Sequence, residues 1–238
     1  MFFDPLYWLI IGIGLVLSFW ASMKTKGTFH KYSQFTTRSR MTGAQVAERI
    51  LADNNIRDVQ VVPIQGNLTD HYDPRSKVLR LSEGVYGSTS MSAAGVAAHE
   101  VGHAIQHAQN YAPLKWRSAW VPVANVGGGI SMFVLMAAVF MGGAATVLGS
   151  KLALVGVLLF ATTTVFTLVT LPVEFDASHR ALATLRRGGY LAPDEIDGAK
   201  KVLDAAALTY VAAFITSALT LFYWALRLGL LGGGGRRR

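Results

Sequence analysis

The sequence predicts a mainly α-helical membrane protein, with four transmembrane helices and a small α+β domain that carries a histidine-rich helix. The first observation is composition, since only 15% of the 238 residues are charged and 52% are apolar. Soluble globular domains carry about 25% charged residues. The second is that the charged residues gather in two polar segments between long apolar stretches. The third is length, because these stretches match the roughly 20 residues that a helix needs to cross a bilayer.

The four apolar stretches give the predicted transmembrane helices. The first begins with MFFDPLYW, which lacks the basic start of a signal peptide, so we expect an uncleaved span. The second and third are expected to form a hairpin with a tight turn at residues 149–151, where Lys151 interrupts the uncharged run. Pro172 is expected to end the third. The predicted helices are residues 1–23, 118–149, 151–173 and 205–228, and a disordered tail is predicted for residues 229–238.

Lysine and arginine residues near the predicted spans indicate the orientation. Twelve of them lie in the polar segments, residues 24–117 and 174–204, and five lie on the other side. Because segments rich in Lys and Arg stay in the cytoplasm, both polar segments are predicted there. The net charge of +8 has the same origin, since the basic residues stand beside apolar stretches. The expected partner is therefore the lipid bilayer and not nucleic acid.

The first polar segment, residues 24–117, reads as a small α+β domain. Residues 42–55 predict a helix, with Thr42 and Gln45 placed as in a capping box. VQVVPIQG, LTDHYDP and KVLRLSEG then predict short strands, and DPRS between the last two is a typical turn. The second polar segment, residues 174–204, is predicted to be helical.

The stretch AAHEVGHAIQH, residues 97–107, contains the motif H-E-x-x-H. On a helix, His99 and His103 lie one turn apart on the same face and can bind one metal ion. Glu100, next to the first of them, can act as general base toward water without ligating the metal. A preceding serine, Ser90 or Ser92, offers the N-cap. The chain has no cysteine, so any metal must be held by His, Asp or Glu.

A catalytic zinc needs a third protein ligand and one open position. His107 lies on the same face but two turns from His99, about 12 Å along the helix axis, which is too far for one ion. The segment LPVEFDASHRAL, residues 171–182, is the better source, because a hairpin of two spans would return it to the histidine helix. We expect Glu174 as the third ligand and keep Asp176 and His107 as alternatives or as residues behind the ligands.

These motifs carry a resemblance to a known family. AAHEVGHAIQH, YAPLKWRSAWVPVAN, LPVEFDASHRAL and the upstream NLTDHYDPRSKVLRLSEGVY resemble the YugP-like neutral zinc metallopeptidases of bacterial membranes, over about residues 43–205. The resemblance implies one Zn²⁺, a polypeptide substrate and a place in the bacterial cytoplasmic membrane. A more distant similarity is to HtpX-like membrane proteases, in which a later E-x-x-x-D supplies a zinc ligand and an aspartate that braces a histidine. Glu174 matches the first of these positions, but Ser178 stands at the second.

The predicted reaction is peptide-bond hydrolysis, with Glu100 moving the proton from water to the leaving amine. The polypeptide substrates could include membrane proteins. An extended substrate segment could pair as an additional strand beside KVLRLS. The sequence is also compatible with two further partners, which are a second copy of the chain in a homo-oligomer and an accessory membrane protein. Candidates for stabilising the oxyanion are His71, Tyr111, His179 and Arg180.

Two other functions are also compatible with the sequence. The first is a non-enzymatic membrane scaffold or assembly factor with a structural or vestigial zinc site, which would usually have a fourth protein ligand. The second is an intramembrane protease, in which the H-E-x-x-H helix would lie within the bilayer. The polar surroundings of the motif, between Glu83 and Lys115, argue against a position within the bilayer.

Overall fold

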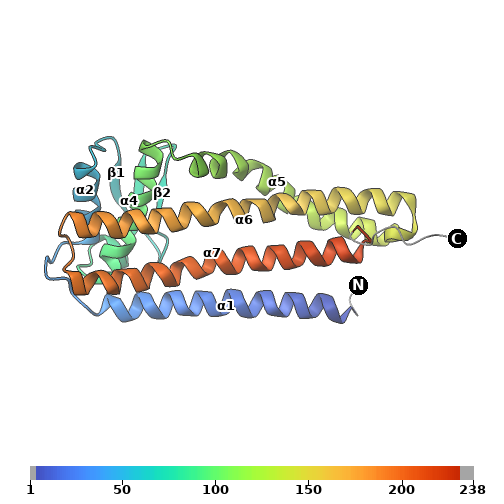
Figure 1. Ribbon diagram of the computed structural model, residues 1–238, viewed down its shortest axis with the longest axis horizontal. Coiled ribbons are helices and arrows are strands. Elements are labelled where there is room, and N and C mark those ends of the chain that lie inside the picture. Colours follow the sequence, from blue (N-terminus) through green and yellow to red (C-terminus); the bar gives the residue numbers. More distant parts are fainter. Residues whose placement is uncertain (1–3, 231–238) are drawn as a thin grey trace. The chain divides into compact units, whose positions relative to one another are not determined.

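The computed structural model describes residues 4–230, which form a mainly helical protein with one small sheet (Figure 1). The chain divides into two compact units: Met1–Phe19, Trp116–Leu171 and Tyr210–Arg238 form the first, and Trp20–Lys115 and Pro172–Thr209 form the second. The elements are α1 (Pro5–Ser33), α2 (Gly43–Asp53), β1 (Gln60–Ile64), β2 (His71–Asp73), β3 (Val78–Ser82), α3 (Glu83–Tyr86), α4 (Met91–Ala108), α5 (Ala112–Phe140), η1 (Gly143–Ala145), α6 (Val147–Arg187) and α7 (Pro193–Arg227).

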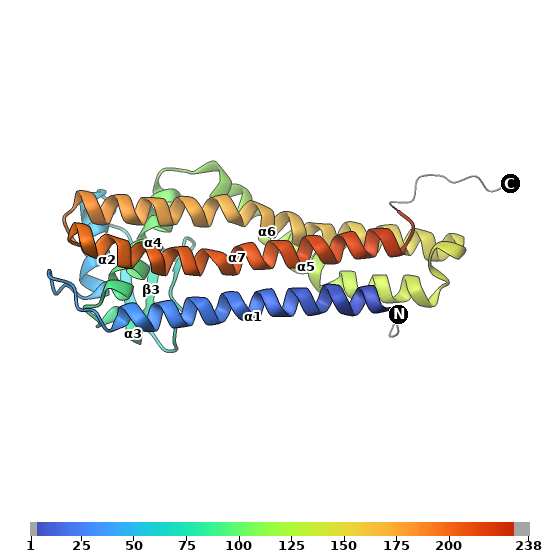
Figure 2. The same cartoon turned by 60° about the horizontal axis from the view of Figure 1, so that its bottom comes forward.

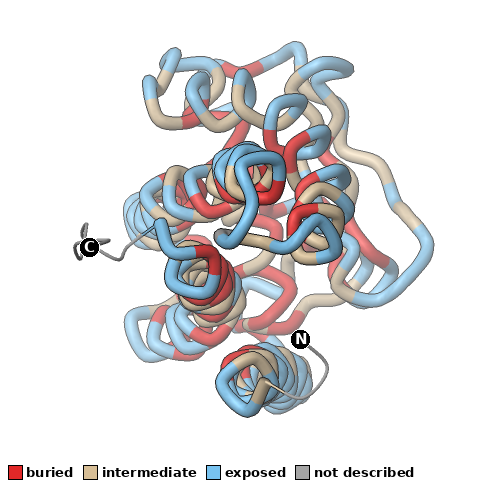
Figure 3. Tube along the Cα trace, turned by 90° about the vertical axis from the view of Figure 1, so that its right-hand side faces the viewer, coloured by how far each residue is buried: buried red, intermediate tan, exposed pale blue. Residues whose placement is uncertain are grey.

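Four helices, α1, α5, α6 and α7, are long and apolar enough to cross a membrane. Many of their large apolar side chains are exposed, among them Phe133 at 78% and Phe19 at 70%. Figure 3 shows the exposed positions in pale blue along these helices. Such surfaces are unfavourable in water but suit contact with lipid chains. The four predicted transmembrane helices are therefore present as helices of sufficient length, and the tail from residue 231 lies outside the described residues.

The predicted ends of these helices need correction. Helix α1 runs ten residues beyond the predicted end, to Ser33, and α7 joins the predicted cytoplasmic residues 193–204 to the fourth span. The helix does not end at Pro172, which lies inside α6. A proline inside a helix costs about 3 kcal/mol. Here two of the residues that follow it, Val173 and Ala177, are fully buried, and their packing offsets that cost.

The turn between α5 and α6 also lies elsewhere than predicted. The chain reverses at residues 141–146, where Gly142 and Gly143 have φ angles of 90° and 56°. Only glycine adopts this left-handed region without strain. The Thr146 hydroxyl accepts a hydrogen bond from the Gly149 N–H at 3.0 Å and so begins α6. Residues 149–151 are helical. The prediction of a turn there relied on the charge of Lys151 and gave no weight to the glycine pair.

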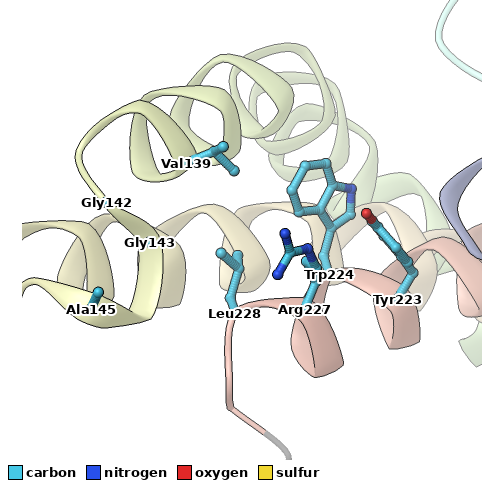
Figure 4. A pocket seen from close by; sticks show the side chains of 8 residues that line it. All are labelled: Val139, Gly142, Gly143, Ala145, Tyr223, Trp224, Arg227 and Leu228. Carbon is cyan, nitrogen blue, oxygen red and sulfur yellow. The ribbon is translucent and has the colours of Figure 1, made fainter. Parts of the chain in front are cut away.

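Within the first unit, the turn between α5 and α6 and the end of α7 line a pocket of about 360 Å³ (Figure 4). Trp224 and Tyr223 are its largest buried side chains. The Tyr223 hydroxyl donates a hydrogen bond to the Asp4 carboxylate at 2.9 Å, which ties α7 to the start of α1. The pocket belongs to the packing of the apolar helices.

The sheet lies in the second unit and has the strand order β1-β3-β2. β3 pairs in parallel with β1 and antiparallel with β2, so both of its edges are occupied. The three predicted strands are all present. The predicted capping box is present too, since the Thr42 hydroxyl accepts from the Gln45 N–H at 3.2 Å and the Thr42 N–H donates to the Gln45 side chain at 2.9 Å.

Helix α4 is central to the core of the second unit and contacts α2, α3, β2 and β3. Figure 2 shows α4 beside α2, α3 and β3. Its core-facing residues are mostly alanine, and Ala93, Ala97 and Ala98 are fully buried. Small side chains let neighbouring backbones approach closely. A β-carbon on Gly102, for example, would lie 2.5 Å from the carbonyl oxygen of Ala177 in α6.

Candidate metal centre

The H-E-x-x-H motif lies in the second half of helix α4. Ser90 is the N-cap, and its hydroxyl accepts a hydrogen bond from the Ala93 N–H at 3.2 Å. The helix therefore starts at Met91, eight residues before His99, and continues to Ala108, which puts His99 and His103 on one face. Their rings meet edge to face, with centroids 4.8 Å apart. The local sequence is sufficient to explain this half of the site.

The other half comes from α6, which brings Glu174 to the two histidines. Its Oε2 lies 3.3 Å from Nε2 of His99 and 3.5 Å from Nε2 of His103. Glu174 is only 3% exposed, so its carboxylate is held inside the protein. One ligand atom from each of the three residues lies within 4.8 Å of the others.

The three side chains fit the geometry of a zinc site. Ligand atoms about 2.0–2.2 Å from a tetrahedral zinc ion stand roughly 3.3–3.6 Å apart. The measured separations of Glu174 Oε2 from the two Nε2 atoms fall in this range. Two imidazole nitrogens and one carboxylate oxygen are also a donor set that zinc accepts. The residues present can therefore hold Zn²⁺.

Each histidine has a polar partner behind it, at the nitrogen that faces away from Glu174. Nδ1 of His99 lies 3.1 Å from the Ser178 hydroxyl. Nδ1 of His103 lies 3.0 Å from Oε1 of Gln106. Ser178 thus stands behind a histidine at the position where the distantly similar proteases have aspartate. Gln106 was not among the predicted site residues, and nothing in its local sequence distinguishes it from an ordinary helix residue.

Asp176 lies behind Gln106 and outside the ligand cluster. Its Oδ2 accepts a hydrogen bond from Gln106 Nε2 at 2.8 Å. The same oxygen accepts from Nε of Arg180, which lies one turn further along α6. Arg180 also donates to the side chain of Gln109 and stands 5.4 Å from the centre of the Tyr111 ring. Asp176, Arg180 and Tyr111 therefore form a connected group beside the site.

The other histidines lie apart from the cluster. Nδ1 of His107 is 2.9 Å from the Tyr72 hydroxyl of β2. His71 is exposed, with Nδ1 2.8 Å from the Thr69 carbonyl oxygen. His179 is exposed on α6. Of the predicted site residues, the structure brings His99, Glu100, His103 and Glu174 together and leaves these three histidines outside.

Glu100 and His103, which are both buried on α4, have raised pKa values. Burial raises the pKa of the Glu100 carboxyl, although the charges of His99 and His103 act against this. Burial disfavours the charged form of His103, but the hydrogen bond and charge of Glu174 raise its pKa overall. A carboxylate with a raised pKa is a stronger proton acceptor, which is what a general base requires.

A family model and a relative of known name both match this chain, and both are described as proteases. Residues 7–229 match the family described as "Putative neutral zinc metallopeptidase". The chain is 48% identical over 208 residues to a Bacillus subtilis (strain 168) protein named "Putative membrane protease YugP", covering 87% of this chain and 89% of that protein. No solved structure matched the chain.

Proposed function

Since the chain belongs to the "Putative neutral zinc metallopeptidase" family, we propose that it is a membrane-embedded, zinc-dependent endopeptidase. His99, His103 and Glu174 hold one Zn²⁺, and Glu100 is the catalytic base. The observation that carries this proposal is the convergence of three ligand atoms within 4.8 Å on two helices, directly beside a buried glutamate. Metallopeptidases of the H-E-x-x-H type use this arrangement of two histidines and a glutamate base.

The roles of the chain's own residues follow from their positions. A bound zinc ion would act as a Lewis acid, lowering the pKa of water and polarising the scissile carbonyl group. Glu100 follows His99 directly and is not in the ligand cluster, so its carboxylate is available for the proton of the attacking water. The same carboxyl group then delivers that proton to the leaving amine. Arg180 and Tyr111 remain candidates for stabilising the oxyanion.

An extended polypeptide is the proposed substrate, and β2 is the proposed strand beside which it adds. The sequence suggested addition beside KVLRLS, but β3 is the central strand and has no open edge. Of the two edge strands, β1 contains Pro63, which has no N–H to donate. β2 contacts α4, the helix that carries the H-E-x-x-H motif, through the Tyr72–His107 hydrogen bond. Its outer edge is therefore the better candidate for backbone pairing.

The bilayer and its orientation complete the proposal. The four apolar helices and the name of the Bacillus subtilis relative support a membrane protein. The excess of Lys and Arg in residues 24–117 and 174–204 supports a site at the cytoplasmic face. A site at that position favours membrane proteins among the substrates.

A scaffold with a structural zinc is the competing proposal. It would use a fourth protein ligand, for which His107 and Asp176 were the candidates. Within residues 4–230, His107 is hydrogen-bonded to Tyr72, and Asp176 is held by Gln106 and Arg180. The ligand cluster has three members, which favours a catalytic site with an open position.

The test compares purified wild type with Glu100→Gln in detergent. Bound zinc is measured by mass spectrometry and peptide cleavage with labelled casein. We expect about one zinc per chain in both proteins and a loss of cleavage of at least about 100-fold in the variant, the size expected for removing a general base. Equal cleavage by both proteins would contradict the assignment of Glu100. A wild type that binds zinc but cleaves nothing would favour the scaffold.

A further inference from the structure

Gln106 is a fully buried polar residue that touches both helices of the candidate metal centre. It lies on α4, three residues after His103, and its exposed fraction is 0%. Oε1 lies 3.0 Å from Nδ1 of His103. Nε2 lies 2.8 Å from the Val173 carbonyl oxygen and 2.8 Å from Oδ2 of Asp176, both on α6. A buried amide usually needs all of these partners, because an unmet polar group costs about 1–3 kcal/mol.

The partners of the amide fix which way it faces. A carbonyl oxygen and a carboxylate oxygen can only accept hydrogen bonds, and the Asp176 carboxylate is already held by the Arg180 guanidinium. The NH₂ group of Gln106 must therefore face Val173 and Asp176. Its oxygen then faces His103, and an amide oxygen can only accept. His103 must accordingly carry its proton on Nδ1.

This tautomer is the one that a metal centre requires. With the proton on Nδ1, Nε2 of neutral His103 carries a lone pair. That Nε2 atom faces Glu174 at 3.5 Å. The partner of His99 gives no such constraint, because the Ser178 hydroxyl can either donate to Nδ1 or accept from it. The protein thus determines the tautomer of one ligand through Gln106.

Gln106 also connects the two ligand-bearing helices. The Val173 carbonyl that it binds belongs to the residue directly before Glu174. One side chain therefore contacts a ligand on α4 and the backbone next to a ligand on α6. Asp176 strengthens this link, since a hydrogen bond to a charged partner is roughly twice as strong as a neutral one.

We propose that Gln106 is a positioning residue of the metal centre, which holds His103 in its Nδ1–H tautomer and transmits the charge of Asp176 to it. The inference rests on the proposed zinc site. Groups behind a ligand histidine typically change metal affinity by about 10–100-fold when removed. Gln106 is not a member of the ligand cluster and reaches it only through His103, so its effect is expected first in metal binding.

The first experiment compares Gln106→Met with Gln109→Met in the full-length, detergent-purified protein. Methionine preserves the volume of glutamine but makes no comparable hydrogen bond. Gln109 is an exposed glutamine at the C-cap of the same helix, and its side chain accepts a hydrogen bond from the Arg180 guanidinium. Zn²⁺ affinity is measured by competition with a chromophoric chelator, and the visible absorption of bound Co²⁺ reports the ligand geometry.

We expect Gln106→Met to weaken zinc binding by about 10–100-fold and to change the Co²⁺ spectrum. Gln109→Met should leave both within about twofold of wild type. Thermal unfolding of the metal-free proteins, followed by circular dichroism, separates an effect on the site from an effect on the fold. Equal affinity and identical spectra for wild type and Gln106→Met would overturn the inference. A wild type that binds no zinc would overturn the proposed metal centre itself.

A reciprocal exchange provides the second experiment. Gln106→Glu places a carboxylate against the carboxylate of Asp176, so metal affinity should fall. The double variant Gln106→Glu/Asp176→Asn exchanges the two groups, and the introduced amide can again donate to the introduced carboxylate. The double variant should bind zinc at least about tenfold more tightly than Gln106→Glu, because the acceptor for His103 Nδ1–H is held in place again. A double variant no better than Gln106→Glu would also overturn the inference.

Discussion

Gly102 of α4 and Ala177 of α6 are in direct backbone contact: a β-carbon on Gly102 would lie 2.5 Å from the Ala177 carbonyl oxygen and 3.1 Å from its Cα. The contact lies one residue before His103 and three residues after Glu174. It therefore sets the distance between the two helices at the point where they supply the proposed ligands. A glycine is required here for space, since its φ angle is that of an ordinary helix.

Gly102→Ala is expected to push α4 and α6 apart, because the obstacle is the backbone of Ala177, which cannot rotate away. Overpacking of this kind costs about 1–3 kcal/mol. Metal affinity should fall together with the melting temperature, which circular dichroism and chelator competition measure. Gly27→Ala is the matched control, since nothing lies within 4 Å of a β-carbon there. It should be neutral or stabilising by up to about 1 kcal/mol. A Gly102→Ala protein as stable and as metal-loaded as Gly27→Ala would refute the spacing argument.

Removing any proposed ligand should empty the site. His99→Ala, His103→Ala and Glu174→Ala are expected to retain less than about a tenth of the wild-type zinc, since only two of the three ligands would remain. His107→Ala is the control on the same helix. It loses the hydrogen bond to Tyr72, at a cost of about 1 kcal/mol, but keeps its zinc. Zinc content after gel filtration measures both results, and loss of zinc in His107→Ala would reopen His107 as a ligand.

Ser178→Ala should weaken zinc binding by about tenfold, at the low end for groups behind a ligand. The hydroxyl lies 3.1 Å from Nδ1 of His99, and it is neutral. Water can take its place only in part, because His99 is largely covered, with a side chain 12% exposed. Competition with a chelator measures the change. An effect larger than that of Gln106→Met would mean that His99, and not His103, has the more important partner.

Asp70 should make stability depend on pH. Burial raises the pKa of its carboxyl, although hydrogen bonds from the Ser82 N–H and hydroxyl lower it in part. A raised pKa means that the folded protein binds the proton more tightly than the unfolded chain. The contribution of Asp70 to stability is therefore greatest below its unfolded pKa, about 3.9, and decreases as pH rises through its folded pKa.

Asp70→Asn removes this ionisation and keeps an oxygen that accepts from Ser82. It should melt at a higher temperature than wild type at pH 7, and the difference should shrink as pH falls toward 4. Asp73→Asn is expected to change stability in the opposite direction, because a hydrogen bond from Ser76 lowers the pKa of Asp73. Thermal unfolding between pH 4 and 8 measures both variants. A constant difference for Asp70→Asn across this range would contradict the prediction.

Local signals in the sequence were enough for several elements. Thr42 with Gln45, and Ser90 before the histidine helix, act within one helical turn, so their caps could be predicted without the rest of the fold. The three strands were predicted as short segments between turn residues. The turn at Gly142–Gly143 was missed because the uncharged run continues through it, although the glycine pair itself marks it and has φ angles of 90° and 56°.

Contacts between distant segments could not be predicted in the same way. Gln106 looks like an ordinary helix residue until Val173 and Asp176 fold beside it, 67 and 70 positions later. The prediction that β3 has a free edge was wrong, because β1 pairs with β3 in parallel. A parallel pairing has no hairpin signal in the sequence. The position of Glu174 could be inferred from the sequence, but its distances to the two histidines depend on the backbone contact between Gly102 and Ala177.

The order of the ligands along the chain has a consequence for the timing of activity. Glu174 follows His99 by 75 positions, and α5 and the part of α6 that precedes Glu174 lie between them. During synthesis the base and both histidines leave the ribosome well before the third ligand exists. A nascent or truncated chain therefore cannot form the complete centre, and under the proposed function it would have no peptidase activity toward neighbouring unfolded chains. The enzyme would become active only once α6 has been made and has packed against α4.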